Sequence, residues 1–366
     1  MSRVALLGNS DLVIYNFRRE IVERLIQDGH EVYILIPKLV HKEFFEGLGC
    51  KVYITPIDRR GTNPITDYKL YRLYIKLFKE IKPDIIYTYT IKCSVYGGMA
   101  AHKLHIPQIA NITGLGSGAV RSRLFQLIYD NMYRIGVKHS VCTFYQNLAN
   151  EEYCLKHGIV GKKHRLLPGS GVNLEHFELL PYPDDSEVHF LYVSRIMKEK
   201  GADEYLELAK AIHMDHPNTV FHVLGFCEEA YQDLLQKYSD EGIIVYHGMQ
   251  DDMMAFQKIS HCTIHPSFYA EGMSNVCLES SSAGRPVITT NNPGCYETVE
   301  HGVTGFVVPM KDTACLIETV RKFLDMSYEE KKQMGLAARK RMEEMFDRNI
   351  VVEAYMSESS EYINKR

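Results

Sequence analysis

Two carboxylates, Glu271 and Glu279, stand eight positions apart, with the run Gly272-Met273-Ser274-Asn275 between them. The apolar run 262–266 before them predicts a strand, and the glycine after Glu271 predicts a turn into a helix. Backbone N–H groups at a helix start have no partner inside the helix, so they can bind an anion. Glu271 precedes this helix and Glu279 lies about one turn inside it. That suits a nucleotide sugar, with phosphate on the helix end, sugar hydroxyls on one acid and ribose on the other. The alternative is an ordinary strand–helix unit with two surface carboxylates.

A second set of anion-binding residue types lies earlier, in the run Val193–Gly201. A strand is predicted to end at Arg195 and a helix to begin after Gly201, so Arg195 and Lys200 can converge on a diphosphate at this turn. Arginine supplies a planar fork of donors and lysine a point charge. Lys198 is interpreted as lying outside this site. The alternative interpretation of Arg195 and Lys200 is that both are solvated charges without a ligand.

These motifs resemble those of retaining glycosyltransferases, in particular glycosyltransferase family 4. The resemblance rests on the two glutamates with seven residues between them, the Gly-x-Ser-Asn insert, the run AGRPVI at 283–288, and Arg-x4-Lys-Gly. It implies the GT-B architecture, in which two Rossmann-like, doubly wound α/β domains face each other across a cleft. It also implies a catalytic group in which Arg195 and Lys200 stabilise a leaving diphosphate and Glu271 holds donor-sugar hydroxyls. Glu279 would bind the ribose, and the backbone amides of Met273, Ser274 and Asn275 would bind phosphate or sugar.

The apolar pattern independently predicts parallel βαβ units along the whole chain. The strand-like runs are 3–9, 31–37, 51–57, 83–90, 107–114, 140–146, 189–195, 219–225, 243–248, 262–266, 286–290 and 305–309. They pause at the Gly-, Pro- and acid-rich segment 166–187, which predicts a domain boundary. We therefore expect an acceptor-side domain at 1–170 and a nucleotide-sugar-binding domain at 171–347. The resemblance implies that the last helix, about 348–366, packs back on the first domain.

The loop after the first strand, Gly8-Asn9-Ser10, has one glycine where most family members carry a richer glycine pair near the donor phosphates. Gly8 remains a candidate donor-binding residue. The departure resembles a subgroup that transfers sugars onto polyprenyl-diphosphate-linked acceptors in bacterial surface-glycan assembly. Arg60 and Lys92, in a turn and after a strand, are candidates for the acceptor diphosphate, with solvated cations as the alternative. Many members place a histidine after the fourth strand; Tyr87–Thr90 stands there, so no histidine role carries over.

Two further features concern the nucleobase and the membrane. Gly225 ends a predicted strand and would let a ligand approach the backbone, and the resemblance implies that it borders the nucleobase together with 246–248. The helix 121–138 carries apolar residues on one face and arginines at its margins, namely Leu124, Leu127, Ile128, Met132 and Ile135 with Arg121, Arg123 and Arg134. This face predicts either membrane docking or packing against the domain's own sheet.

Charge and composition narrow the class of protein. Residues 1–180 carry a net charge of +8 and the remaining residues −12, which favours an anionic partner of the first half. No nucleic-acid module is recognised, so a lipid-linked phosphate at an anionic membrane is favoured over nucleic acid. No apolar run approaches the ~18–20 residues of a membrane span, no signal-peptide pattern opens the chain, and the nine cysteines form no C-x-x-C pair. We therefore expect a cytoplasmic protein that associates peripherally with the inner face of the bacterial membrane.

The expected reaction is transfer of a sugar from UDP-GalNAc, UDP-Gal or UDP-GlcNAc to a polyprenyl-diphosphate-linked or other glycan acceptor, in capsule, lipopolysaccharide or related glycan assembly. The resemblance implies retention by front-face attack. No Asp-x-Asp pair or clustered His and Cys ligands occur, so neither a metal nor a cofactor is expected. One alternative is a UDP-sugar 2-epimerase of the same fold, for which no convincing acid–base residues are seen. Another is a non-catalytic glycan-binding subunit, which the presence of Arg195, Lys200, Glu271 and Glu279 disfavours.

Overall fold

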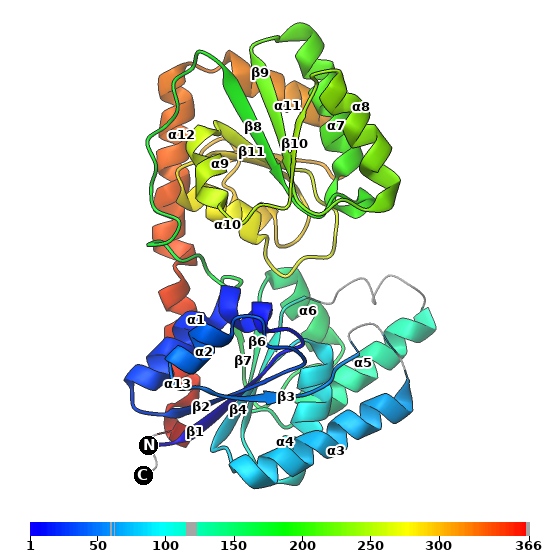
Figure 1. The fold of residues 1–366 in the computed structure, drawn as a ribbon, viewed down its shortest axis with the longest axis vertical. Helices are drawn as coiled ribbons and strands as arrows, with labels where there is room; N and C mark the ends of the chain where they lie inside the picture. The colour runs from blue at the N-terminus through cyan, green and yellow to red at the C-terminus, as the bar shows by residue number, and fades with distance from the viewer. Residues whose placement is uncertain (59–60, 62, 115–122, 364–366) are drawn as a thin grey trace. The chain divides into compact units, whose positions relative to one another are not determined.

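The chain divides into two compact units. The computed structural model describes residues 1–363 except 59–60, 62 and 115–122. The first unit is Met1–Ser170 with the segment from Arg348 onward, and the second is Gly171–Asp347. Each unit contains one parallel sheet with helices packed on it (Figure 1). The predicted α/β class with two doubly wound sheets is confirmed.

The first unit has seven parallel strands in the order β3-β2-β1-β4-β5-β6-β7. The strands are β1 (Arg3–Leu7), β2 (Glu31–Ile36), β3 (Lys51–Ile54), β4 (Ile85–Tyr89), β5 (Gln108–Ile112), β6 (Cys142–Tyr145) and β7 (His164–Leu166). The helices are α1 (Asp11–Gln27), α2 (Lys42–Gly47), α3 (Pro64–Ile81), η1 (Cys93–Gly97), α4 (Gly98–Lys103), α5 (Arg123–Val137), α6 (Leu148–Lys156) and α13 (Arg348–Ile363). The strand order reverses between β1 and β4, and ligands of such sheets bind at the strand ends beside this switch point.

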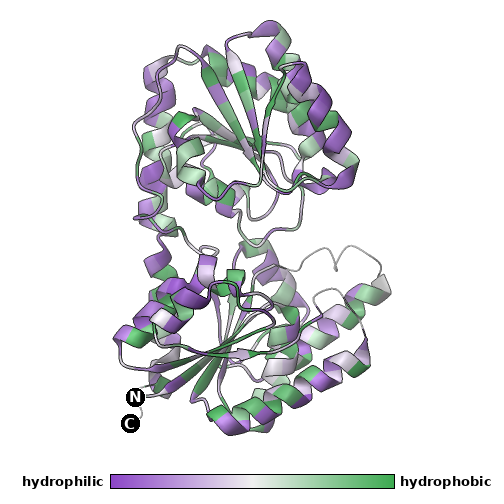
Figure 2. Cartoon of the chain, viewed as in Figure 1, coloured by the Kyte–Doolittle hydropathy of each residue, from purple (hydrophilic) through white to green (hydrophobic). Residues whose placement is uncertain are grey.

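Side chains of β1 alternate between two buried layers. Val4 and Leu6 pack in one cluster with residues of α1 and α13, whereas Ala5 and Leu7 pack in another with residues of α3 and α4. Because helices cover both faces, the strands are apolar almost without interruption, and Figure 2 shows the strands of this sheet as hydrophobic along most of their length.

The C-terminal helix α13 completes the first unit. The Tyr355 ring lies 5.0 Å from Tyr87 and 4.8 Å from Phe144, and its hydroxyl accepts a hydrogen bond of 2.9 Å from Asn111 Nδ2. At the start of the helix, Arg348 Nη1 lies 2.9 Å from Glu20 Oε1 of α1. The helix is therefore bound to the first sheet by a buried aromatic cluster and to α1 by an ion pair.

The second unit has six parallel strands in the order β10-β9-β8-β11-β12-β13. The strands are β8 (Val188–Val193), β9 (Thr219–Leu224), β10 (Val245–Gly248), β11 (Cys262–His265), β12 (Val287–Thr290) and β13 (Gly305–Val308). The helices are η3 (Lys198–Lys200), α7 (Ala202–Asp215), η4 (Glu229–Tyr231), α8 (Gln232–Asp240), α9 (Met253–Ile259), α10 (Asn275–Ser282), η5 (Tyr296–Thr298), α11 (Thr313–Asp325), α12 (Tyr328–Arg341) and η6 (Met342–Phe346). The switch point lies between β8 and β11, so the loops after these two strands meet there.

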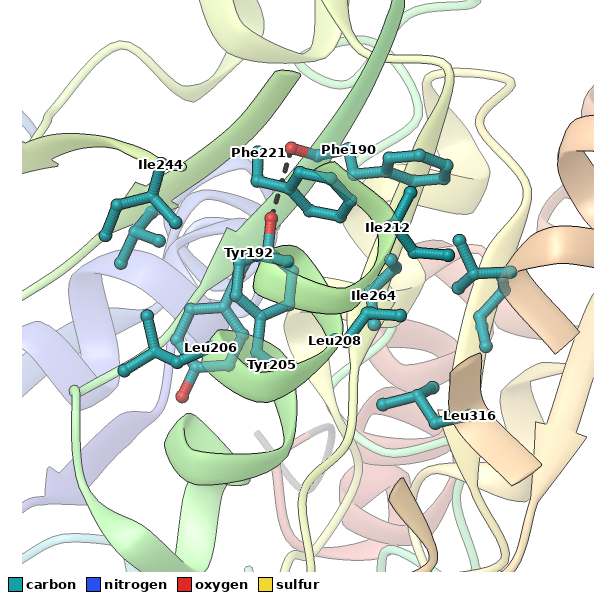
Figure 3. Close-up of a cluster of buried hydrophobic side chains, with 14 of the residues drawn as sticks. Phe190, Tyr192, Tyr205, Leu206, Leu208, Ile212, Phe221, Ile244, Ile264 and Leu316 are labelled. Atoms are coloured by element: carbon teal, nitrogen blue, oxygen red, sulfur yellow. Dashed lines mark hydrogen bonds between the residues drawn. The ribbon is translucent and has the colours of Figure 1, made fainter. Parts of the chain in front are cut away.

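One face of the second sheet carries its main hydrophobic core. Phe190 and Phe221 stack on neighbouring strands with ring centroids 5.1 Å apart, and Tyr205 of α7 packs edge-on against Phe221 (Figure 3). The Tyr205 hydroxyl donates to the Phe190 carbonyl oxygen at 3.3 Å. This polar contact at the end of an otherwise apolar side chain orients α7 on the sheet.

The elements differ from the predicted runs mainly at two places. Helix α6 and strand β7 lie outside the predicted runs, because the buried residues of α6 are Asn150 and Cys154, too few for an apolar stripe, and all three residues of the edge strand β7 are exposed. Helix α1 begins at Asp11 because the Ser10 side chain accepts a hydrogen bond from the Leu12 amide and caps it. Within the described residues, no helix combines the length and the apolar character that a bilayer span requires.

Candidate active site

The loops after β8 and β11 lie against each other at the switch point of the second sheet. The backbone of Gly201 has φ of 77°, and a Cβ there would lie 2.3 Å from the Pro266 carbonyl oxygen. The Phe268 amide donates to the Glu199 carbonyl oxygen at 2.9 Å. Glycine at position 201 therefore allows the loop that carries Arg195 and Lys200 to contact the loop that carries Glu271.

Lys200 and Glu271 form an ion pair across this contact. The Lys200 ammonium donates to Glu271 Oε1, and each side chain is 13% exposed. Ser267 Oγ donates to the same carboxylate oxygen at 3.3 Å. The structure thus brings together two of the three residues predicted to be catalytic.

The environment of Glu271 keeps its carboxylate charged. Burial by itself would raise the pKa of this carboxyl, but the neighbouring His265 imidazole and Lys200 ammonium outweigh burial and lower the pKa to about 2. A carboxylate can accept hydrogen bonds from sugar hydroxyls but cannot donate a proton at neutral pH. Glu271 is therefore suited to orient a donor sugar and unsuited to act as a general acid.

Arg195 joins the pair through a shared aromatic ring. The Arg195 guanidinium lies 5.4 Å and the Lys200 ammonium 4.9 Å from the centroid of the Tyr269 ring. Cations within about 6 Å of such a ring are attracted to its face. Arg195 is exposed, whereas Lys200 is partly buried, so the two cations present adjacent positive charges at one strand end, as the sequence predicts for a diphosphate site.

Helix α10 starts beside this ion pair, as predicted, and is held by a second glycine contact. The Ser274 side chain caps the helix by accepting from the Cys277 amide, and the Ser274 amide donates to the Gly294 carbonyl oxygen at 2.7 Å. A Cβ on Gly294 would lie 2.6 Å from the Gly272 carbonyl oxygen. The Ser274 amide already donates to a protein carbonyl. Of the three backbone amides predicted to bind phosphate or sugar, those of Met273 and Asn275 therefore remain as candidates.

The remaining acid, Glu279, lies in the second turn of α10 and is half-buried. Its position inside the helix, with Glu271 in the preceding loop, matches the predicted order of the two acids. The ribose contact itself stays a prediction.

Gly225 makes close backbone contacts inside the protein. Its φ is 133°, and a Cβ there would lie 1.8 Å from the Ser194 carbonyl oxygen. Its amide donates to the Gly248 carbonyl oxygen at 2.8 Å. The backbone that approaches Gly225 is thus that of the residue before Arg195, so this glycine positions the diphosphate loop. Its contact with a nucleobase stays a prediction.

Two of the three candidate residues of the first unit, Gly8 and Lys92, follow the carboxyl ends of β1 and β4. The Gly8 amide donates to the Leu35 carbonyl oxygen at 3.0 Å. Lys92 is 8% exposed, and its ammonium lies 2.6 Å from Asp67 Oδ1, while the Tyr96 hydroxyl donates to the other Asp67 oxygen at 2.8 Å. The Lys92 charge is therefore already paired, and binding an acceptor phosphate would require it to exchange partners. Arg60 lies outside the described residues.

Three residues of the apolar face of α5 are exposed to solvent. Leu127 is 60%, Ile128 51% and Ile135 57% exposed, so the predicted alternative of packing against the sheet is wrong for these three residues. Tyr133 and Val137 face inward in their place. Of the arginines, Arg134 donates to the His157 carbonyl oxygen at 2.8 and 3.0 Å, which ties α5 to the end of α6. The structure does not describe the Arg121 and Arg123 side chains.

Several residues of the site escape prediction from the sequence. His265, Tyr269 and Gly294 surround Glu271 but match no spacing that signals a ligand site. His265 is 2% exposed, and its Nε2 lies 3.7 Å from Glu271 Oε1. A polar residue that ends a buried strand at the switch point is the signal that could have singled it out.

Two parallel sheets, with a cationic loop, an ionised glutamate and a helix start at the switch point of the second one, form the arrangement that the sequence predicts for a glycosyltransferase. Family models agree: "Glycosyl transferase 4-like" matches residues 3–147, and "Glycosyl transferases group 1" matches residues 181–341. The chain belongs to the glycosyltransferases that these two models describe.

Individual relatives and solved structures extend the comparison. The chain is 23% identical over 372 residues to N,N'-diacetylbacillosaminyl-diphospho-undecaprenol alpha-1,3-N-acetylgalactosaminyltransferase of Campylobacter jejuni, covering 97% of both chains. It is 25% identical over 293 residues to UDP-Gal:alpha-D-GlcNAc-diphosphoundecaprenol alpha-1,3-galactosyltransferase of Escherichia coli, covering 75% of both. HepE of Anabaena, solved in complex with UDP and glucose, superimposes with a TM-score of 0.80 at 16% identity, over 99% of this chain and 100% of that one. The structural likeness shows that the fold is GT-B.

Proposed function

We propose that this chain is a retaining glycosyltransferase that moves a hexosyl group from a UDP-sugar to a sugar on a polyprenyl diphosphate, in capsule, lipopolysaccharide or related glycan assembly. The observation that carries the proposal is the Lys200–Glu271 ion pair at the β8–β11 switch point, with Arg195 over the same Tyr269 ring as Lys200. A diphosphate needs positive charge and a sugar needs hydrogen-bond acceptors, and this arrangement supplies both within one contact.

The reacting bonds follow from these charges. The bond between the anomeric carbon and the β-phosphate oxygen of the donor breaks, and the acceptor hydroxyl oxygen bonds to the same face of that carbon. The acceptor proton passes to the departing phosphate oxygen. Arg195 and Lys200 stabilise the negative charge that develops on the diphosphate, while Glu271 holds the donor-sugar hydroxyls and Glu279 the ribose.

The same two cations support transfer without a divalent ion. In metal-dependent transferases a bound cation neutralises the leaving diphosphate. Here a guanidinium and an ammonium lie at the strand end where that charge develops, which supports metal-independent transfer.

The names of the relatives support the choice of substrates. One relative is named for transfer of N-acetylgalactosamine and another for transfer of galactose from UDP-Gal, each to a sugar on diphospho-undecaprenol, and the HepE complex contains UDP. For this chain we propose UDP-GalNAc, UDP-Gal or UDP-GlcNAc as donor and an undecaprenyl-diphosphate-linked sugar as acceptor.

An acceptor-dependence assay tests the proposal. The purified chain is incubated with each UDP-sugar, with and without a synthetic polyprenyl-diphosphate-linked saccharide. We expect UDP release and a product heavier by one residue of the donor sugar only when acceptor is present, with the donor's anomeric configuration retained by NMR. Conversion of the UDP-sugar without acceptor would indicate an epimerase, and UDP binding with no turnover on any acceptor would indicate a non-catalytic subunit.

We further propose that the first unit rests on the anionic membrane through α5. The exposed residues Leu127, Ile128 and Ile135 lie on one face of this helix, in a half of the chain that carries a net positive charge. Exposed apolar residues on a helix in a basic region suit the membrane interface. Replacing Leu127 and Ile128 with serine should weaken sedimentation with anionic liposomes and leave UDP affinity unchanged, while added salt should weaken it in both proteins. Equal sedimentation of the double variant and wild type would contradict this assignment.

A further inference from the structure

Within the described part of the chain, three metal-ligand residue types converge on the inner side of the Lys200–Glu271 ion pair. One ligand atom each of His265, Glu271 and Cys295 lies within 4.8 Å of the other two. Histidine nitrogen, carboxylate oxygen and cysteine sulfur are the ligands that zinc takes in proteins. His265 ends β11, Glu271 belongs to the loop that follows it, and Cys295 follows β12.

The backbone around these residues is fixed by close contacts. Thr289 Oγ1 donates to the His265 carbonyl oxygen at 2.8 Å. Gly294, next to Cys295, is pressed against the Glu271 loop, because a Cβ on it would lie 3.1 Å from Glu271 Cβ. The three ligands therefore come from backbone segments that already touch, and only side-chain rotations separate them from the ligand spacing of roughly 3.5 Å that a tetrahedral zinc site requires.

His265 provides an independent reason to expect a ligand. It is 2% exposed, its Nδ1 has no hydrogen-bond partner, and its Nε2 faces Glu271 Oε1 at 3.7 Å, which is longer than a hydrogen bond. A buried polar group without a partner costs stability. A metal ion bonded to one ring nitrogen would supply the missing partner.

We propose that His265, Glu271 and Cys295 form a binding site for zinc or a similar borderline divalent ion, and that occupancy inhibits the enzyme. The thiol proton of Cys295 is released to solvent as the metal–sulfur bond forms. A metal on Glu271 replaces Lys200 as its cationic partner, so Lys200 loses one of the two contacts, with Glu271 and with the Tyr269 ring, that hold it beside Arg195. The inhibition rests on the proposed role of Lys200, whereas the binding does not.

The charge and softness of the ligands select the metal. A nitrogen, an oxygen and a sulfur ligand suit zinc or cobalt(II) and disfavour magnesium, which prefers an all-oxygen shell. Three protein ligands also leave a fourth position open, as in catalytic zinc sites. Magnesium should therefore neither occupy this site nor inhibit transfer.

Metal binding is tested on the full chain, prepared with reduced thiols and without chelator. Cobalt(II) titration should give thiolate-to-metal absorption that saturates at one equivalent, and zinc should displace it and raise the melting temperature. Cys295→Ser and Cys295→Ala should lose this absorption and bind zinc at least 10- to 100-fold more weakly, since a direct ligand is worth at least as much as an outer-shell partner. Cys277→Ser is the matched control, because Cys277 is equally buried in α10 but lies outside the three-residue set; it should keep the absorption and the affinity.

The outcomes separate the binding site from the proposed function. Absence of thiolate absorption in wild type, or its persistence in both Cys295 variants, would overturn the site, whatever the enzyme transfers. In the glycosyltransferase assay, zinc should inhibit wild type and Cys277→Ser reversibly and spare the Cys295 variants, and excess chelator should restore activity. Thiolate absorption without inhibition would retain the site and overturn its effect on Lys200.

Discussion

Replacing His222 with glutamine should make the free energy of unfolding less dependent on pH between pH 6.5 and 4. His222 lies in the middle of a row of histidines on the sheet face opposite the main core of the second unit. His222 Nε2 is 2.9 Å from His189 Nδ1, and His222 Nδ1 is 2.9 Å from His247 Nε2. Glu187 Oε2 lies 3.1 Å from His189 Nε2 at the end of the row.

One tautomer satisfies the whole row. The carboxylate of Glu187 accepts from His189 Nε2–H, which leaves His189 Nδ1 to accept from His222, and His222 Nδ1 to accept from His247. A proton added to His222 Nδ1 would face the Nε2–H donor of His247, so the charged form of His222 would lose this hydrogen bond. Burial first, and then the neighbouring imidazoles, lower the pKa of His222 from 6.5 to about 4.

The sign and size of the effect follow from this pKa. Between pH 6.5 and 4 the unfolded chain binds a proton at His222 that the folded chain does not, so the free energy of unfolding falls as the pH falls through this window. At roughly 1.4 kcal/mol per pH unit, the loss from His222 is about 3 kcal/mol by pH 4. Burial also lowers the pKa values of His247 and His261, which act in the same direction.

Urea unfolding of the full chain, followed by circular dichroism at several pH values, measures this loss. His222→Gln should reduce the slope of the free energy of unfolding against pH by about 1.4 kcal/mol per pH unit, the contribution of one proton. His176→Gln, at an exposed position of the same unit, should leave this slope as in wild type. An NMR titration of the His222 imidazole gives a direct check. Titration of that ring near pH 6.5, or equal slopes in wild type and His222→Gln, would refute the reasoning.

Three further predictions concern the proposed transfer reaction. Arg195→Ala should slow turnover by roughly 10²–10³, or about 2–4 kcal/mol of leaving-group stabilisation, with an unchanged melting temperature because the side chain is exposed; near-normal turnover would contradict the diphosphate assignment. Glu279→Ala should weaken UDP binding in calorimetry, whereas Glu271→Ala should spare UDP binding and impair turnover, and equal UDP affinity in wild type and both variants would refute the ribose contact. Transfer should persist in excess EDTA, and a complete loss that magnesium or manganese reverses would show a catalytic metal site.

The sequence predicts the elements and the charged residues well for a physical reason. Parallel strands covered on both faces must be apolar throughout, so β1 to β6 and β8 to β13 stand out as apolar runs. Cations and acids next to strand ends then mark the ligand edge of each sheet. These two rules place Arg195, Lys200 and Glu271 on this edge of the second sheet, and the resemblance to the family motifs assigns their roles.

Contacts between distant segments do not follow from such rules. The sequence offers Lys92 as a free cation, whereas the fold places it 2.6 Å from Asp67 of α3, twenty-five positions away. Helix α5 shows the same limit, because its apolar face could be buried or exposed with the same periodicity. The sequence pattern identifies the charged and apolar side chains that could bind a ligand or a membrane. Only the packing of the folded chain decides which of them remain free to do so.

Three glycines of the candidate site also make contacts between distant segments that the sequence pattern does not reveal. Gly201, Gly225 and Gly294 each permit a backbone of another segment to approach within a distance that a Cβ would forbid: Pro266, Ser194 and Gly272, respectively. From the sequence, Gly225 is interpreted as a place where a ligand meets the backbone, because a glycine at a strand end permits either kind of approach. In the structure a protein backbone approaches each of the three glycines, and the nucleobase contact of Gly225 stays a prediction. The loops of the candidate site can therefore pack together only because these positions carry no side chain. Even alanine at 201 or 294 should disturb the Lys200–Glu271 pair, although neither substitution removes a group that is predicted to touch a substrate.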